Sequence, residues 1–87
     1  MWSVYILRCG DGSLYTGAAL DVMKRLRAHQ SGRGAAYTRS HQPVALAYAE
    51  EVGTKGEALR REAAIKRLSR AEKLALIEGA AGKSPQV

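Results

Sequence analysis

Short runs of β-branched and aromatic residues, separated by turn residues, dominate the first part of the chain. Residues 2–9, WSVYILRC, predict a strand that is buried on both faces for part of its length. The GDGS segment that follows supplies the glycines that a tight hairpin turn requires, and residues 14–18 predict the second strand. A third strand is predicted over residues 44–52, and Pro43 fits at its start.

The remaining segments carry helix signals. Asp21 is placed to cap a helix over residues 22–30, and the glycines of SGRG end that helix. Residues 33–42 are expected to form a polar loop. Two pairs have the spacing of a capping box and predict the starts of two further helices: Thr54 with Glu57, and Ser69 with Glu72. Gly79 is expected to stop the last helix, and residues 80–87 to form a flexible tail.

The predicted order is strand, strand, helix, strand, helix, helix. This order is typical of a small α+β fold in which helices flank a three-stranded antiparallel sheet. The chain has 87 residues, so a single domain is expected, and we place it at residues 1–79. A chain of this size buries only roughly 60–65% of its unfolded surface, so its core is thin.

The charge balance narrows the choice of partner. The chain has 14 Lys and Arg residues against 8 Asp and Glu, a net charge of +6. This excess favours a polyanion, nucleic acid before an anionic membrane, over a merely solubilising surface. Residues 22–49 contain no acid and five cations: Lys24, Arg25, Arg27, Arg33 and Arg39. The exposed members of this run are expected to follow a phosphate backbone, with Arg60, Arg61 and Arg67 in a secondary place.

The single cysteine, Cys9, excludes an internal disulfide and a structural zinc site. The sequence has neither a secretory signal nor an apolar run long enough to span a membrane. The protein is therefore expected in the cytoplasm, without a membrane partner.

Polar residues stand on helix faces where apolar residues are expected. In the helix over residues 22–30, Val22, Leu26 and His29 share one side. Arg25 lies at the margin of that side, one turn from His29, so the two side chains can reach a common point. The alternatives are a histidine bonded to a backbone carbonyl at the edge of the core and an arginine that extends to solvent.

Glu62 falls within the apolar stripe of the next helix, which Leu59, Ile65 and Leu68 mark. A carboxylate on a buried face is costly unless it is paired or holds a metal ion. Lys66 follows four residues later and could simply pair with it. Both interpretations stay open on the spacing alone.

These residues, with Tyr5 and Tyr15 at the same end of the hairpin, suit phosphodiester hydrolysis. One carboxylate is too few for a typical glycosidase, and the chain has neither a nucleophile elbow nor a glycine-rich phosphate loop. A carboxylate can hold a divalent ion that polarises a phosphoryl oxygen. An arginine can clamp the phosphate, and a phenol or imidazole can position and deprotonate water.

The chain resembles the GIY-YIG endonucleases of the small stand-alone bacterial type over about residues 2–78. The first motif of that family appears as Ser3-Val4-Tyr5 and the second as Tyr15-Thr16-Gly17. Ser3 stands where the first motif usually has glycine. Ala18 and Ala19 stand where a bulkier or polar residue is usual, so the resemblance implies no substrate contact at those two positions.

The resemblance implies roles for individual residues. The implied catalytic residues are Tyr5, Tyr15, Arg25, His29 and Glu62, and Glu62 is also the implied metal ligand. The segment GRGAAYTRSHQPV is similar to a loop of this subgroup and makes Tyr37 and Arg39 candidate substrate contacts. With Gly17 and the basic run, the predicted substrate-binding residues are Gly17, Lys24, Arg27, Arg33, Tyr37 and Arg39.

The leading hypothesis is a DNA endonuclease that depends on a divalent metal, Mg²⁺ or Mn²⁺, and acts in DNA repair or recombination. The alternative is a nucleic-acid-binding protein with the same fold that cleaves poorly or not at all. A third interpretation is an interaction module whose protein partner supplies the targeting. The general base, whether Tyr5, Tyr15 or His29, the choice between DNA and RNA, and the oligomeric state stay open.

Overall fold

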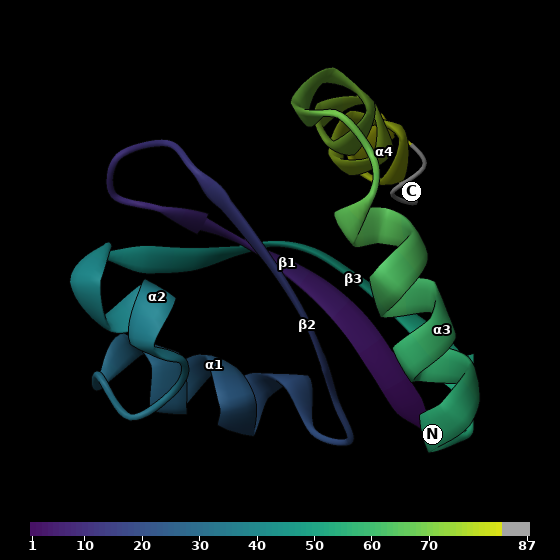
Figure 1. Ribbon diagram of the computed structural model, residues 1–87, viewed down its shortest axis with the longest axis horizontal. Coiled ribbons are helices and arrows are strands. Elements are labelled where there is room, and N and C mark those ends of the chain that lie inside the picture. The colour runs from purple at the N-terminus through teal and green to yellow at the C-terminus, as the bar shows by residue number, and fades with distance from the viewer. Residues whose placement is uncertain (83–87) are drawn as a thin grey trace.

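Helices lie on both sides of a three-stranded antiparallel sheet (Figure 1). The computed structural model describes residues 1–82. The strands are β1 (Trp2–Cys9), β2 (Leu14–Ala19) and β3 (Val44–Gly53), with β1 in the centre. The helices are α1 (Val22–Gln30), α2 (Ala36–Ser40), α3 (Lys55–Lys66) and α4 (Arg70–Gly82). The predicted fold class and element order are confirmed, and α2 is an addition. No helix within residues 1–82 has the length and apolar character needed to cross a membrane.

Local signals set the ends of most elements. Gly12 in the β1–β2 turn and Gly32 after α1 have positive φ angles of 86° and 80°, which favour glycine. The Asp21 carboxylate accepts the Lys24 backbone N–H at 3.0 Å and caps α1. Both reciprocal hydrogen bonds of the two predicted capping boxes form, at the starts of α3 and α4.

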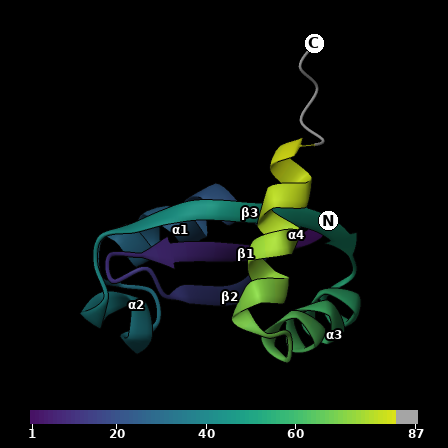
Figure 2. The same ribbon diagram turned by 90° about the horizontal axis from the view of Figure 1, so that it is seen from above.

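Successive residues of β1 face opposite sides of the sheet. Tyr5, Leu7 and Cys9 pack against Leu26 of α1. Val4 and Ile6 face the other way and pack against residues of α3 and α4: Ala58, Ile65 and Ile77. Figure 2 shows α2 near the end of the sheet where β1 ends, whereas α3 and α4 lie toward the other end.

The two hairpin tyrosines lie on the same face of the sheet. Tyr5 stands opposite Gly17 and Leu7 stands opposite Tyr15, so Tyr5 and Tyr15 are diagonal neighbours. Their common face is the one that α1 covers. The register therefore directs both phenols toward His29.

The predicted polar loop over residues 33–42 is wrong in part, because it contains α2. The Thr38 side chain is fully buried, and its hydroxyl donates to the Ala35 carbonyl at 3.0 Å. The Ser40 hydroxyl donates to the Ala36 carbonyl at 3.1 Å. These bonds hold a single helical turn that has no amphipathic pattern to reveal it.

Two further local predictions are wrong. Helix α4 continues through Gly79 and ends at Gly82, since one glycine costs about 1 kcal/mol in a helix and does not by itself stop it. The beginning of the predicted tail is therefore helical, and residues 83–87 lie outside the described residues. Leu59 is 45% exposed, whereas Ala58, one residue earlier, is fully buried.

Candidate active site

A chain of buried hydrogen bonds connects β1, α1 and α2. The Tyr5 hydroxyl lies 2.8 Å from His29 Nε2, and His29 Nδ1 lies 2.7 Å from Thr38 Oγ1. All three side chains are essentially buried. A buried polar group is costly unless it is hydrogen-bonded, so each of these contacts holds its neighbours in place.

The direction of these hydrogen bonds follows from the Thr38 hydroxyl, which is the last donor in the series. Because the Thr38 hydroxyl donates to the Ala35 carbonyl, its oxygen is free to accept from His29 Nδ1–H. Nε2 then accepts the proton of the Tyr5 hydroxyl. The Ala35 backbone N–H also approaches Nδ1, but at 3.4 Å, so the shorter bond to Thr38 determines the tautomer.

The surroundings keep both Tyr5 and His29 neutral at pH 7. Burial raises the pKa of the Tyr5 phenol to about 12; Tyr15 and Glu62 act in the same direction and the Arg25 guanidinium opposes them. Burial, followed by the charge of Arg25, lowers the pKa of His29. Neutral imidazole is the form that can accept a proton.

Two glycines allow this close packing. A Cβ at Gly17 would lie 2.5 Å from the Tyr5 hydroxyl oxygen, and a Cβ at Gly34 would overlap the His29 ring. Gly17 is buried beneath Tyr5, so the structure gives it a packing role. Direct contact of Gly17 with substrate stays a prediction.

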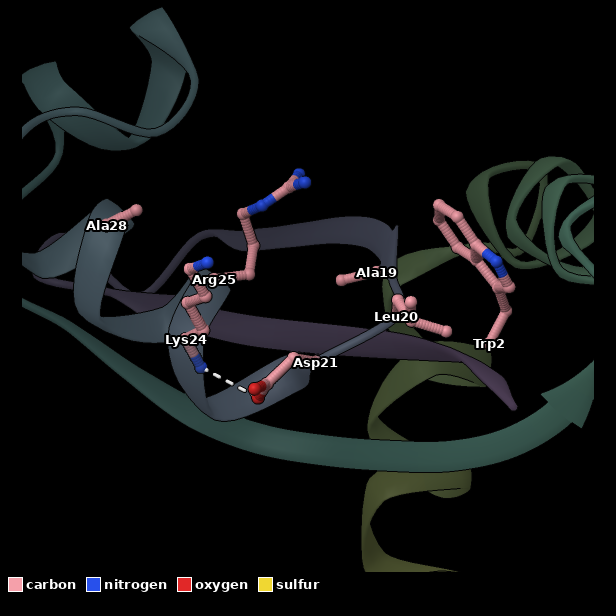
Figure 3. Close-up of a pocket in the computed structure, with 7 residues that line it drawn as sticks. All are labelled: Trp2, Ala19, Leu20, Asp21, Lys24, Arg25 and Ala28. Carbon is pink, nitrogen blue, oxygen red and sulfur yellow. Dashed lines mark hydrogen bonds between the residues drawn. The ribbon is translucent and has the colours of Figure 1, made fainter.

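Arg25 extends from α1 into an open pocket beside the buried hydrogen bonds. Figure 3 shows its side chain projecting from the helix, with Trp2 on the opposite side of the pocket. The pocket is also lined by Ala19, Leu20, Asp21, Lys24 and Ala28. The positive charge of the Arg25 guanidinium acts to lower the pKa of both Tyr5 and His29.

Glu62 lies on α3, which packs against the other face of the sheet. Its side chain is 18% exposed and lies 3.3 Å from Lys66 Nζ, so the pair that the spacing allows does form. Its negative charge also acts on the Tyr5 phenol. Within residues 1–82, no group of three His, Cys, Asp or Glu side chains could hold a metal ion.

Tyr15 stands at the outer edge of the site. Its ring centroid lies 5.3 Å from that of His29 and 6.0 Å from that of Tyr37. Tyr37 in turn is stacked on His41, with centroids 4.0 Å apart and ring planes 4° apart. Aromatic rings thus lead outward from the buried histidine to the surface.

The other predicted substrate-binding cations lie on the surface. Lys24, Arg27, Arg33 and Arg39 are exposed. Arg61, which was expected among the secondary phosphate contacts, instead donates to Glu50 at 2.9 and 3.1 Å. Glu50 also accepts the Tyr48 hydroxyl, so the Arg61 guanidinium ties α3 to β3.

Sequence reasoning missed three residues of this arrangement: Gly34, Thr38 and His41. Gly34 and Thr38 touch His29 from a segment that was expected to be a loop. No periodicity marks them, because a five-residue helix is too short to show one. The Tyr37–His41 spacing of four residues was the available signal, since it places two rings on one face of a helical turn.

Both the sequence and the fold have relatives among known proteins. The family model for the GIY-YIG catalytic domain matches residues 1–75. A UPF0213 protein of Staphylococcus saprophyticus is 54% identical over 74 residues, covering 85% of this chain and 90% of that protein. A UPF0213 protein of Halobacterium salinarum is 50% identical over 76 residues, covering 87% and 99%.

Two solution NMR structures have a similar fold. A UPF0213 protein of Bacillus halodurans has 44% identity and a TM-score of 0.60, covering 95% of this chain and 89% of that chain. A protein of E. faecalis has 37% identity and a TM-score of 0.61, covering 93% and 86%.

Proposed function

The chain belongs to the GIY-YIG family of nucleases, and from that membership and the site we propose that it is a DNA endonuclease dependent on a divalent metal. The main supporting observation is that several polar groups of the site act on the Tyr5 phenol. His29 accepts its proton at 2.8 Å, the Tyr15 ring centroid lies 5.3 Å from that of His29, and the charges of Arg25 and Glu62 act on the pKa of the phenol. These groups come from β1, β2, α1 and α3.

The donor set fits a hard divalent ion. Glu62 offers one half-buried carboxylate, and the described residues contain no cluster of three protein ligands. Mg²⁺ is commonly held by one or two carboxylates, with water and phosphate oxygens at its other positions. Glu62 would hold the ion after its contact with Lys66 opens, and a bound ion would polarise the phosphoryl oxygen and stabilise the leaving oxygen.

The residues of the chain supply the other parts of the reaction. Arg25 clamps the scissile phosphate and stabilises the charge that develops on it. A phenol with a pKa of about 12 is a poor base on its own. Tyr5 therefore takes a proton from the attacking water as it passes its own to His29 Nε2. Water oxygen bonds to phosphorus, the bond from phosphorus to the leaving oxygen breaks, and the leaving oxygen takes a proton from solvent.

The test compares Glu62→Gln with Glu78→Gln, which changes an exposed carboxylate on α4. Labelled single-stranded, duplex and branched DNA is incubated with Mg²⁺, Mn²⁺ or chelator. We expect Glu62→Gln to abolish cleavage and leave DNA affinity nearly unchanged, and Glu78→Gln to retain both. Cleavage by Glu62→Gln, or by the unaltered protein in chelator, would contradict the role of Glu62.

The alternative is a nucleic-acid-binding protein that has lost cleavage. Four exposed cations support binding in either case: Lys24, Arg27, Arg33 and Arg39. Salt-dependent binding by the unaltered protein, without cleavage of any of these DNA structures in either metal, would favour this alternative.

A further inference from the structure

Three stacked or nearly stacked rings form a ladder at the open edge of the site. We call Tyr15, Tyr37 and His41 the aromatic ladder. The centroid distances along it are 6.0 Å and 4.0 Å, and the ring planes are 22° and 4° apart. Its inner end touches His29, whose centroid lies 5.3 Å from that of Tyr15. The ladder is therefore continuous with the proposed catalytic residues.

Hydrogen bonding fixes the outer ring. His41 Nδ1 lies 2.6 Å from the Tyr37 carbonyl oxygen, to which it donates, and Nε2 lies 3.7 Å from an Asp11 carboxylate oxygen. The imidazole is thus held parallel to the Tyr37 ring. A flat surface whose orientation is already fixed loses little conformational entropy when a ligand stacks on it.

The ladder is exposed and lies in basic surroundings. Tyr37 is 40% exposed, and 30% of the His41 side chain is exposed. Arg39 projects from the same short helix, and Arg33 precedes it; both are exposed. Rings that served only to anchor α2 would gain most by full burial. Partly exposed aromatic rings beside cations are instead typical of surfaces that bind single-stranded nucleic acid.

We propose that the aromatic ladder stacks unpaired bases and that the substrate is nucleic acid with a single-stranded segment at the site. The substrate assignment rests on the proposed nuclease function. Bases in a duplex already stack on one another and cannot offer their faces to a protein ring. Unpaired bases can, whatever their identity, because every base has a π face.

The test measures binding in chelator, so that cleavage does not enter. The fluorescence anisotropy of a labelled strand is compared for three ligands: the strand with its bases, a strand of equal length with abasic sites, and the duplex. We expect the protein to bind the strand with bases about 10-fold or more tightly than the abasic strand. The duplex should bind more weakly than the single strand.

Variants separate stacking from charge. Tyr37→Leu should remove the preference for bases, whereas Tyr37→Phe keeps the ring and should keep the preference. Arg39→Ala should weaken binding to both single strands by the same factor and leave their ratio unchanged. If Tyr37→Leu fails to fold, Tyr37→Phe and the three ligands on the unaltered protein still decide the question.

Equal affinity for the strand with bases and the abasic strand would overturn the proposal, as would tighter binding of the duplex. Cleavage with Mg²⁺ or Mn²⁺ is measured separately. Base-dependent binding without any cleavage would support the ladder and reject the nuclease function. Cleavage of abasic and base-bearing strands at equal rates and affinities would keep the nuclease function and reject the ladder.

Discussion

The two faces of the sheet differ in the side chains that the central strand β1 presents to them. On the α3 and α4 face, Val4 and Ile6 pack against aliphatic side chains. On the α1 face, Tyr5 binds a buried histidine that binds a buried threonine. Because neighbouring residues of β1 serve the two faces in turn, the apolar packing of one face holds the polar chain of the other in position.

The comparison predicts that the apolar face carries more of the stability. Ile65 is fully buried against Val4 and Ile6. Ile65→Ala removes its packing and leaves a cavity, which should lower the free energy of unfolding by about 2–5 kcal/mol. Urea denaturation measures this effect. Leu59→Ala, at an exposed position of the same helix, should change stability by only about 0.5 kcal/mol.

The α1 face should carry the reaction rate. Arg25→Lys keeps the charge but loses the planar two-pronged donor geometry. Loss of one preorganised charge donor in other enzymes costs on the order of 100- to 1000-fold in rate. We expect a decrease of that size in single-turnover cleavage at saturating DNA and matched salt.

Arg27→Lys is the matched control, since Arg27 is exposed two residues along the same helix. It should leave the single-turnover rate nearly unchanged. Equal losses in the two variants would make Arg25 one more phosphate contact and would contradict its catalytic assignment.

The sequence predicted the elements that local patterns determine and missed those that tertiary contacts determine. The alternation in β1 and the capping boxes are local, and they form as expected. The α2 turn depends on the bond between Thr38 and His29, nine residues earlier, and on the Tyr15–Tyr37 contact across the fold. No pattern within α2 itself reveals these contacts.

The predicted buried position in helix α3 was wrong by one residue for a related reason. Leu59 is the more hydrophobic residue, but Ala58 is the one that packs beneath the sheet, fully buried. A small residue suits a position where helix and sheet approach closely, so hydrophobicity alone chose the wrong neighbour. Glu62 keeps its half-buried place, because Ala58 and Ile65 lie one turn to either side of it on the same face.

Thr38→Val tests the hydrogen bonds that connect Tyr5, His29 and Thr38, with almost no change in side-chain shape. The variant leaves His29 Nδ1–H without its acceptor in a buried site, which should lower the free energy of unfolding by about 1–3 kcal/mol. Without this acceptor the proton of His29 is no longer held on Nδ1. Cleavage should therefore slow, because Nε2 ceases to accept from Tyr5. Ser40→Ala removes an exposed hydroxyl of the same helix and should have little effect on either measurement.

Thr16→Val makes the same chemical change on the apolar face, where we expect the opposite effect on the free energy of unfolding. Thr16 stands opposite Ile6 in the sheet and is 3% exposed. Its hydroxyl has no hydrogen-bond partner among residues 1–82. A buried hydroxyl without a partner is costly, so its replacement by a methyl group of the same shape should stabilise the protein by about 1 kcal/mol. For a domain of this size, that corresponds to a rise in Tm of about 4–8 °C.

Thermal unfolding of the Thr16→Val and Thr38→Val proteins under one condition sharpens the comparison. Opposite shifts in Tm would show that one face of the sheet is built to exclude polar groups and the other to use them. A loss of stability in Thr16→Val would contradict this division, because it would mean that the Thr16 hydroxyl is bonded, for instance to a buried water. Cleavage by Thr16→Val should stay unchanged, since its side chain faces away from Tyr5 and His29.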